Sequence, residues 1–152
     1  MFFELIINIG EKIPFADLPT GLAHCDIFLD NMIKNTSSKI YLLDFEEVAI
    51  ENYLFDVGRS IIGCCIHNDL VDLNLARRLI EGYETVRKLS SLEIDYLVDY
   101  IIYCGGISAF WRYYEFNVKR PDEEKKDFYK KILTPVKALI DNKDHVKSLL
   151  IS

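Results

Sequence analysis

From about residue 54 onward, apolar residues recur with the spacing of amphipathic helices. Apolar positions three and four residues apart place one face of a helix in a core. The pattern predicts helices over residues 54–67, 75–86, 90 to beyond 104, and 121–139. A short apolar segment, residues 2–10, predicts another helix at the start of the chain. The chain is therefore expected to be mainly helical.

Local signals predict where two of these helices begin and where two are interrupted. Residues 90–93, Ser-Ser-Leu-Glu, form a capping box in which the serine and glutamate side chains satisfy free backbone N–H groups. Pro121 precedes three acidic residues, which is typical of a helix start because acids favour the positive end of the helix dipole. Gly105 and Gly106 predict a break in the third helix, and Pro135 predicts a kink in the last.

The segment before residue 54 follows a different pattern. Residues 11–21 hold two prolines and a glycine, which predict a connecting loop. Two short apolar runs, residues 32–33 and 40–43, flank the polar turn 35–38 and predict a β-hairpin. We therefore expect an α+β fold, with a small hairpin module followed by a mainly helical body, in a single domain spanning residues 1–152.

Composition narrows the classes of partner. The chain has 152 residues, is 50% apolar, and carries 18 basic against 24 acidic residues, a net charge of −6. This charge disfavours nucleic-acid binding, which needs a basic face, but it leaves ATP open because one phosphate site needs only local positive charge or a metal. The start of the chain lacks the basic region of a signal peptide, and the longest uncharged apolar run, residues 100–111, is too short to span a bilayer. Neither nucleic acid nor a membrane is expected as a partner, and the expected location is cytoplasmic.

The four cysteines add no metal or disulfide motif. Cys64 and Cys65 are adjacent, and Cys25 and Cys104 stand apart from them, so the spacing of neither a zinc site nor a disulfide framework is present. We expect reduced thiols. Cys25 lies beside His24, but adjacent residues on an extended segment point in opposite directions, which argues against a thiol–histidine pair.

The groups that could perform chemistry are concentrated between residues 22 and 56. His24, Asp26 and Asn31 form the pattern H-x-D-x-x-x-x-N, and Asp44 ends the apolar run 40–43. Phosphoryl transfer from ATP needs a carboxylate to orient the attacking hydroxyl and hard oxygen ligands for Mg²⁺. Asp26 could supply the first, and Asn31 and Asp44 the second, if the hairpin returns Asp44 to the loop. The alternative is that these polar residues only cap turns.

Three segments carry a family resemblance. HCDIFLDN (24–31), LLDFEE (42–47) and YLFDVG (53–58) resemble the kinases of the aminoglycoside phosphotransferase and choline kinase superfamily. Residues 28–31 and the segment from residue 105 are most similar to its homoserine kinase branch, and the resemblance covers about residues 15–140. It implies a protein-kinase-like C-terminal lobe, with ATP and Mg²⁺ as cofactors and a small hydroxyl substrate, an amino alcohol such as homoserine, as acceptor.

The resemblance also implies roles for individual residues. Asp26 would be the catalytic base, and Asn31 and Asp44 the metal ligands. The loop would be supported by two residues, His24 and Asp56. The substrate side would include Asp30 and Arg112, although the aromatic cluster around Arg112 is also consistent with a simple core.

One departure from the family pattern affects the expected activity. The seven glycines form no G-x-G-x-x-G, and only 23 residues precede His24, too few for a lobe that covers the nucleotide and supplies a phosphate-binding lysine. We therefore expect that another chain supplies this lobe, that the chain is truncated, or that it is a catalytically inactive remnant acting as a binding or regulatory fragment. A bare apolar surface on the hairpin module would then favour self-association or a partner.

Overall fold

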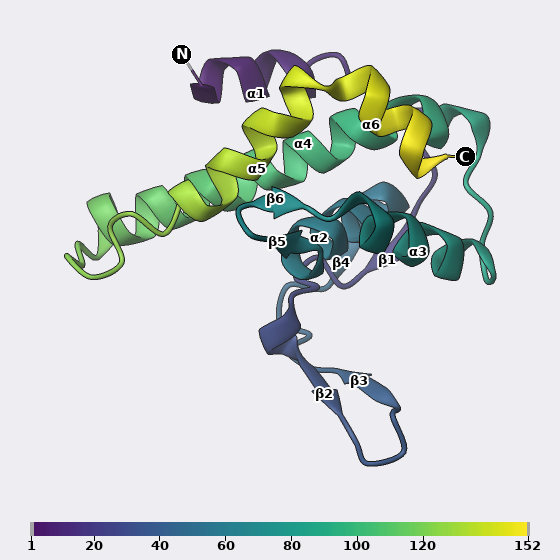
Figure 1. Cartoon of the computed structure of the whole chain (residues 1–152), viewed down its shortest axis with the longest axis horizontal. Helices are drawn as coiled ribbons and strands as arrows, with labels where there is room; N and C mark the ends of the chain where they lie inside the picture. Colours follow the sequence, from purple (N-terminus) through teal and green to yellow (C-terminus); the bar gives the residue numbers. More distant parts are fainter. Residues whose placement is uncertain (1, 152) are drawn as a thin grey trace.

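The computed structural model describes residues 2–151, which combine short strand pairs with helices (Figure 1). In chain order they are α1 (Phe2–Gly10), β1 (Thr20–Ala23), the 3₁₀ helix η1 (Leu29–Asn31), β2 (Met32–Lys34), β3 (Ile40–Leu42), β4 (Ala49–Asn52), α2 (Tyr53–Cys64), β5 (Ile66–His67), β6 (Leu70–Val71), α3 (Leu73–Glu84), α4 (Ser91–Tyr114), the π-helical turn η2 (Glu115–Lys119), α5 (Lys130–Asp141) and α6 (Lys143–Leu150). The predicted α+β class is confirmed.

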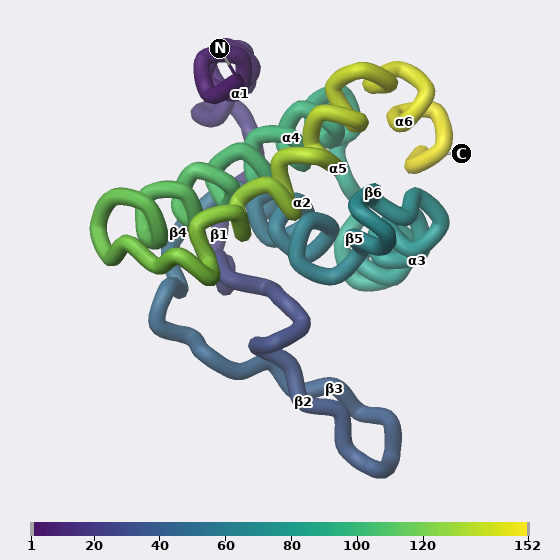
Figure 2. Tube along the Cα trace, turned by 60° about the vertical axis from the view of Figure 1, so that its left-hand side comes forward, coloured from purple at the N-terminus to yellow at the C-terminus, as the bar shows by residue number. Residues whose placement is uncertain are grey.

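Helix α4 is the centre of the molecule, and α1, α2 and α5 pack around it (Figure 2). Its start carries the predicted capping box. The Ser90 hydroxyl accepts the Glu93 N–H at 3.2 Å, and the Glu93 carboxylate accepts the Ser90 N–H at 2.8 Å. The core along this helix is large and apolar, with Tyr100, Ile101 and Ile102 all at most 1% exposed.

The predicted break at Gly105 and Gly106 is wrong, because α4 runs unbroken through both. A Cβ at Gly105 would lie 2.3 Å from Val136 on α5, and one at Gly106 would lie 2.3 Å from Ile6 on α1. The two glycines therefore allow two neighbouring helices to approach α4 closely. They serve packing between helices, and tertiary contacts outweigh their low helix propensity.

The predicted start of the last helix at Pro121 is also wrong. Residues 123–129 form successive turns, and α5 begins only at Lys130. The Asp122 carboxylate accepts the N–H of Glu124 at 2.9 Å, which holds the chain in a local turn. Helix α5 then continues through Pro135 to Asp141, and a separate helix, α6, follows it.

The predicted hairpin is present as β2 and β3, with Ile33 paired to Tyr41, and it projects away from the helical body (Figure 1). Two other strand pairs were not predicted. Strands β1 and β4 pair antiparallel, with Ala23 opposite Ala49, although 25 residues lie between these two in the sequence. Strands β5 and β6 form a hairpin whose turn residues, Asn68 and Asp69, have positive φ. Because this hairpin begins at Ile66, α2 ends at Cys64, before the predicted boundary at residue 67.

A buried hydrogen-bond network fixes the start of α2 against α4. The Asn52 amide donates to the Phe15 carbonyl at 3.1 Å and accepts the Tyr100 hydroxyl at 2.9 Å. Asn52 is 2% exposed, so these bonds are shielded from competing water. The helix that follows is thereby held in place beneath the polar loop at residues 24–31. Within residues 2–151, none of the helices combines the length and the apolar character needed to cross a bilayer.

Candidate phosphotransfer site

The loop that begins at His24 is held by the first turn of α2. The two carboxylate oxygens of Asp56 accept the backbone N–H groups of His24 and Cys25, both at 2.8 Å. Cys25 has a φ of 66°, so the chain turns sharply there in a left-handed conformation that non-glycine residues seldom adopt. Both predicted support residues, His24 and Asp56, thus lie at the base of this loop.

The His24 ring joins the loop to the segment after β3. Its Nδ1 accepts the Asp26 N–H at 3.3 Å, so Nε2 carries the proton and donates to the Leu43 carbonyl at 2.9 Å. The ring also packs on Phe45, with centroids 4.7 Å apart. Both nitrogens are therefore engaged in holding backbone, and the ring connects two segments 19 residues apart in sequence.

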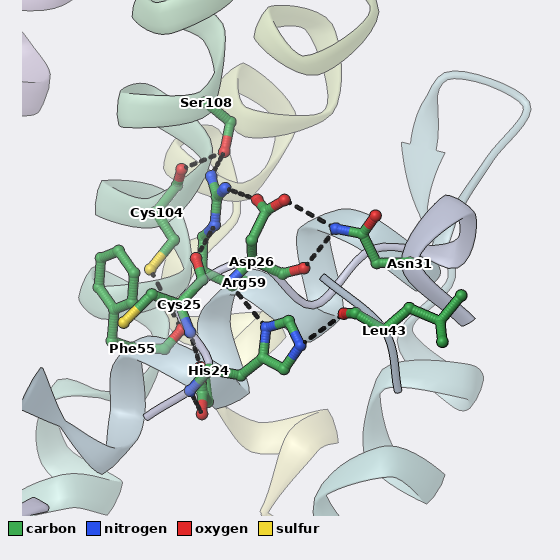
Figure 3. Close-up of polar contacts among 10 residues, drawn as sticks. His24, Cys25, Asp26, Asn31, Leu43, Phe55, Arg59, Cys104 and Ser108 are labelled. Atoms are coloured by element: carbon green, nitrogen blue, oxygen red, sulfur yellow. Dashed lines mark hydrogen bonds and ion pairs between the residues drawn. The ribbon is translucent and has the colours of Figure 1, made fainter. Parts of the chain in front are cut away.

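Asp26 and Asn31 form a direct pair at the mouth of the loop. The Asn31 Nδ2 donates to the Asp26 Oδ2 at 2.8 Å and to the Asp26 carbonyl at 2.9 Å (Figure 3). Since both bonds use the amide nitrogen, the orientation of the Asn31 side chain is fixed and its oxygen is left for another partner. The hairpin also returns to this point, because the Leu43 N–H donates to the Asn31 carbonyl at 2.9 Å.

Asp44 follows this doubly anchored Leu43 and has a φ of 60°. Its side chain lines the same cavity as Asp26 and Asn31. The cavity measures about 530 Å³, within the range of small-molecule sites. The hairpin predicted from the sequence therefore brings the three residues of the predicted phosphotransfer set to one cavity.

Two of these residues, Asn31 and Asp44, fit a magnesium ion whose remaining ligands are phosphate oxygens. Mg²⁺ is usually held by one or two carboxylates and by substrate phosphates rather than by a full protein cage. In the part of the chain that the structure describes, no cluster of three or more His, Cys, Asp or Glu residues forms such a cage. Asn31 and Asp44 offer one amide oxygen and one carboxylate, which matches the first arrangement.

The two candidate substrate residues also reach this cavity, Asp30 from the loop and Arg112 from α4. Burial lowers the pKa of the Arg112 guanidinium, an effect that Asp30 and Asp26 oppose and Arg59 reinforces. Within residues 2–151, Arg112 makes no hydrogen bond or ion pair, and these charges act on it from a longer distance. An incompletely compensated cation of this kind favours binding of an anionic group.

Sequence reasoning missed Arg59, which lies at the centre of the site. It projects from α2 and donates hydrogen bonds to the Cys25 carbonyl, the Ser108 hydroxyl and the Asp26 carboxylate (Figure 3). A signal was present in the sequence, because Asp56 and Arg59 stand three residues apart on one face of a predicted helix. The remaining lining residues of the cavity come from the same loop, the segment after β3, and α2 and α4: Cys25, Phe28, Glu46, Glu47, Phe55, Ile107, Ser108 and Trp111.

Comparison with known proteins identifies the family of this chain. Residues 4–89 match the model of the phosphotransferase enzyme family. A homoserine kinase of Burkholderia ambifaria is 30% identical over 121 residues, which are 72% of this chain and 36% of that protein. A homoserine kinase of Bartonella tribocorum is 33% identical over 89 residues, 58% of this chain and 28% of that protein. The chain thus spans about a third of the curated relatives it matches.

A solved structure shares the fold. The crystal structure of a choline/ethanolamine kinase family protein from Mesorhizobium loti superposes with a TM-score of 0.72 at 16% identity, over 99% of this chain and 50% of that one. The family match covers more than half of the chain and includes all of the loop, the hairpin and α2. The chain therefore belongs to the phosphotransferase enzyme family, and its sequence is similar to that of homoserine kinases.

Proposed function

We propose that this chain carries the acceptor and metal-binding side of an ATP- and Mg²⁺-dependent phosphotransferase that acts on the hydroxyl of a small amino-alcohol substrate. The observation that carries the proposal is the convergence of Asp26, Asn31 and Asp44 on one cavity of about 530 Å³. Positioning and charge stabilisation account for most of the catalysis of phosphoryl transfer, and these residues provide both.

Each residue has a defined task in this proposal. Asp26 accepts a hydrogen bond from the acceptor hydroxyl and orients its oxygen toward the terminal phosphorus atom of ATP. It takes up the hydroxyl proton as the new oxygen–phosphorus bond forms and the bond to the leaving ADP breaks. Asn31 and Asp44 would hold Mg²⁺, which neutralises charge on the phosphate oxygens when it is bound. His24 and Asp56 act through the backbone, since they fix the loop from which Asp26 projects.

Homoserine is the favoured acceptor. It carries a hydroxyl, an ammonium group and a carboxylate, and the cavity presents an acid, Asp30, and a half-buried base, Arg112. The relatives named as homoserine kinases support the same choice. Choline and ethanolamine have no carboxylate, so neither could form an ion pair with the Arg112 guanidinium in the cavity.

The test is ADP release by the 152-residue chain. Mg²⁺-ATP is supplied with homoserine, choline, ethanolamine or an aminoglycoside, and Asp26→Asn is compared with the exposed control Asp17→Asn. Turnover with homoserine that falls about 100-fold or more in Asp26→Asn and is retained in Asp17→Asn supports the proposal. Turnover with choline but not homoserine would contradict the acceptor assignment, and turnover that survives Asp26→Asn would contradict the role of the base.

A second candidate is a binding fragment that lacks turnover on its own or works with a separate chain. One observation favours it: the described lining of the cavity includes two arginines and no lysine. A lysine that pairs with the nucleotide phosphates is a recurring part of kinase sites. Calorimetric binding of homoserine without ADP release, with turnover appearing when a chain carrying such a lysine is added, would select this candidate.

A further inference from the structure

We propose that Arg59 is a positioning residue of the phosphotransfer site, which holds the Asp26 carboxylate and the loop backbone in one fixed arrangement against α2 and α4. This inference rests on the proposed phosphotransfer function. It is carried by the contacts of a single guanidinium that reaches three separate parts of the site (Figure 3).

Each nitrogen of the guanidinium donates a hydrogen bond to a neighbour that is part of the site. Its Nε donates to the Cys25 carbonyl at 3.1 Å, its Nη1 to the Ser108 hydroxyl at 2.5 Å, and its Nη2 to the Asp26 Oδ1 at 2.5 Å. The Arg59 side chain is only 14% exposed, so water competes weakly for these bonds. One face of the guanidinium lies over the Phe28 ring, 4.6 Å from its centroid.

Arg59 belongs to one face of α2 that contacts the backbone of the loop. Asp56, one turn earlier, accepts the N–H of Cys25, and Arg59 donates to the carbonyl of the same residue. Gly63, one turn later, allows close approach, because a Cβ there would lie 2.4 Å from the Ile27 carbonyl oxygen. These three residues lie on one face of the helix, so the position of the loop is determined by a rigid element.

The same contacts fix the carboxylate itself. Arg59 holds the Asp26 Oδ1 and Asn31 donates to its Oδ2, so rotation of the carboxylate is restricted from both sides. A hydroxyl acceptor then meets an oxygen whose position is already set, which reduces the entropy lost on reaching the transition state. Ser108, which accepts a hydrogen bond from Arg59, donates in turn to the Cys104 carbonyl at 2.8 Å. It thereby connects the Arg59–Asp26 ion pair to the interior of α4.

Lysine cannot replace this arrangement. An ammonium on a flexible stem offers one nitrogen, whereas the guanidinium presents three nitrogens in a rigid plane. Arg59→Lys therefore keeps the charge and loses at least two of the three contacts. This makes the lysine variant a test of geometry at constant charge.

The experiment measures kcat and KM for ATP and homoserine in wild type, Arg59→Ala and Arg59→Lys. Arg78→Ala and Arg78→Lys are matched controls, because Arg78 is exposed on α3. We expect kcat to fall about 100-fold in Arg59→Ala and nearly as far in Arg59→Lys, with KM changed less than about threefold. Added guanidinium ion, below denaturing concentrations, should restore part of the kcat of Arg59→Ala and none of that of Asp26→Asn. A kcat within about threefold of wild type in both Arg59 variants would overturn the inference.

Amide hydrogen exchange separates this inference from the proposed function. If wild type shows no turnover with any acceptor, phosphotransfer by this chain fails, and exchange then decides the role of Arg59. Faster exchange over residues 24–31 in Arg59→Ala, with exchange in the α4 interior unchanged, supports the positioning role. Exchange that stays as slow as in wild type over the loop, or that rises equally throughout the molecule, overturns it.

Discussion

Three aspartates of the site differ in what already occupies their oxygens. Asp56 accepts two backbone N–H groups and is committed to the loop. Asp26 has one oxygen on Arg59 and the other on Asn31. Within residues 2–151, the Asp44 carboxylate makes no hydrogen bond or ion pair to the protein. An acid left uncommitted beside an amide oxygen is the group best suited to a cation, so chemical roles follow from the surroundings rather than from the residue type.

Asp44→Asn should weaken divalent-cation binding without unfolding the protein. Asparagine has the same shape and tolerates the positive φ of this position, but it removes the negative charge. We expect Mn²⁺ affinity in the presence of ATP to fall roughly 10- to 100-fold or more, since even the partners of metal ligands contribute that much. Electron paramagnetic resonance of free Mn²⁺ measures this. Asp69→Asn is the matched control, because Asp69 has the same φ of 60° in a turn away from the cavity. Equal affinities in the two variants would remove Asp44 from the metal site.

Alkylation should distinguish the four cysteines by burial. Burial raises the pKa of the Cys25 and Cys64 thiols and raises that of Cys65 to about 12, so little thiolate is present near neutral pH. Cys65 and Cys104 are at most 1% exposed, and we expect them to resist iodoacetamide while the half-exposed Cys25 and Cys64 react slowly. Raising the pH should speed these reactions. Peptide mass spectrometry gives the order, and early modification of Cys104 would contradict the structure.

Ligand protection extends the same measurement to the site. Cys25 lines the cavity and Cys64 does not. Mg²⁺-ATP or homoserine should therefore slow labelling of Cys25 and leave Cys64 as an internal reference. Equal protection of both thiols would indicate a general change in the protein rather than occupation of the cavity.

At the scale of elements, periodicity predicted which segments are helical but not how the helices end or meet. The capping box at Ser90 is a local signal, and it marks the start of α4 correctly. Gly105 and Gly106 look like a break because their environment, the side chains of Val136 and Ile6, comes from helices far away in sequence. The pairing of β1 with β4 was missed for the same reason, since the signal lies in long-range register and not in either segment.

Gly105→Ala should destabilise the protein, although alanine is the better helix former. The new Cβ would lie 2.3 Å from Val136, and crowding of a packed interior costs roughly 1–3 kcal/mol, more than the gain in helix propensity. Gly82→Ala on α3 is the matched control, because a Cβ there meets nothing within 4 Å. It should stabilise the protein by about 0.5–1 kcal/mol. Denaturant unfolding measures both, and changes of the same sign would show that packing at Gly105 is not the deciding factor.

The buried ion pair between Arg87 and Glu93 should contribute to acid sensitivity. Burial acts to raise the pKa of Glu93, but hydrogen bonds from Arg87 and Ser90 outweigh it and lower that pKa below the usual 4.5. A depressed carboxyl pKa stabilises the fold above the unfolded-state pKa, and this stabilisation is lost as the pH falls through the folded-state pKa. The free energy of unfolding should therefore decline below about pH 4.5 partly through this residue.

Glu93→Gln tests the pair. At pH 7 we expect the free energy of unfolding to fall by roughly 2 kcal/mol. This is less than the cost of breaking a fully buried pair, because Arg87 is 28% exposed. The difference in the free energy of unfolding between wild type and variant should become smaller as the pH falls below about 4.5. Glu81→Gln, which alters an exposed pair with Arg77, serves as control and should change stability by less than about 0.5 kcal/mol. A difference that is constant with pH would show that Glu93 is not the titrating group.

At the scale of the whole molecule, the site lies where the hairpin module meets α2 and α4, and this explains how much of it was predictable. Asp26 and Asn31 share one loop, and the hairpin that returns Asp44 is visible in local sequence. The contact between Arg59 and Ser108 joins residues 49 positions apart on two helices, which periodicity alone cannot align. The grouping of Asp26, Asn31 and Asp44 and the supporting residues His24 and Asp56 were therefore predictable from the sequence, whereas the support from Arg59 and Ser108 was not.

The hairpin beside the site exposes apolar surface, and we expect the chain to self-associate through it. Ile33 is 53% exposed and its cross-strand partner Tyr41 is 50% exposed, on a two-stranded hairpin that projects from the body (Figure 1). Both strands have one unpaired edge, which can accept a strand from a second copy. Sedimentation velocity should show a coefficient that rises with protein concentration. Ile33→Lys should suppress this rise, because a charge would be buried in the contact. Val86→Lys, at an isolated valine that is 91% exposed, should leave it unchanged. A monodisperse monomer at every concentration would contradict the prediction.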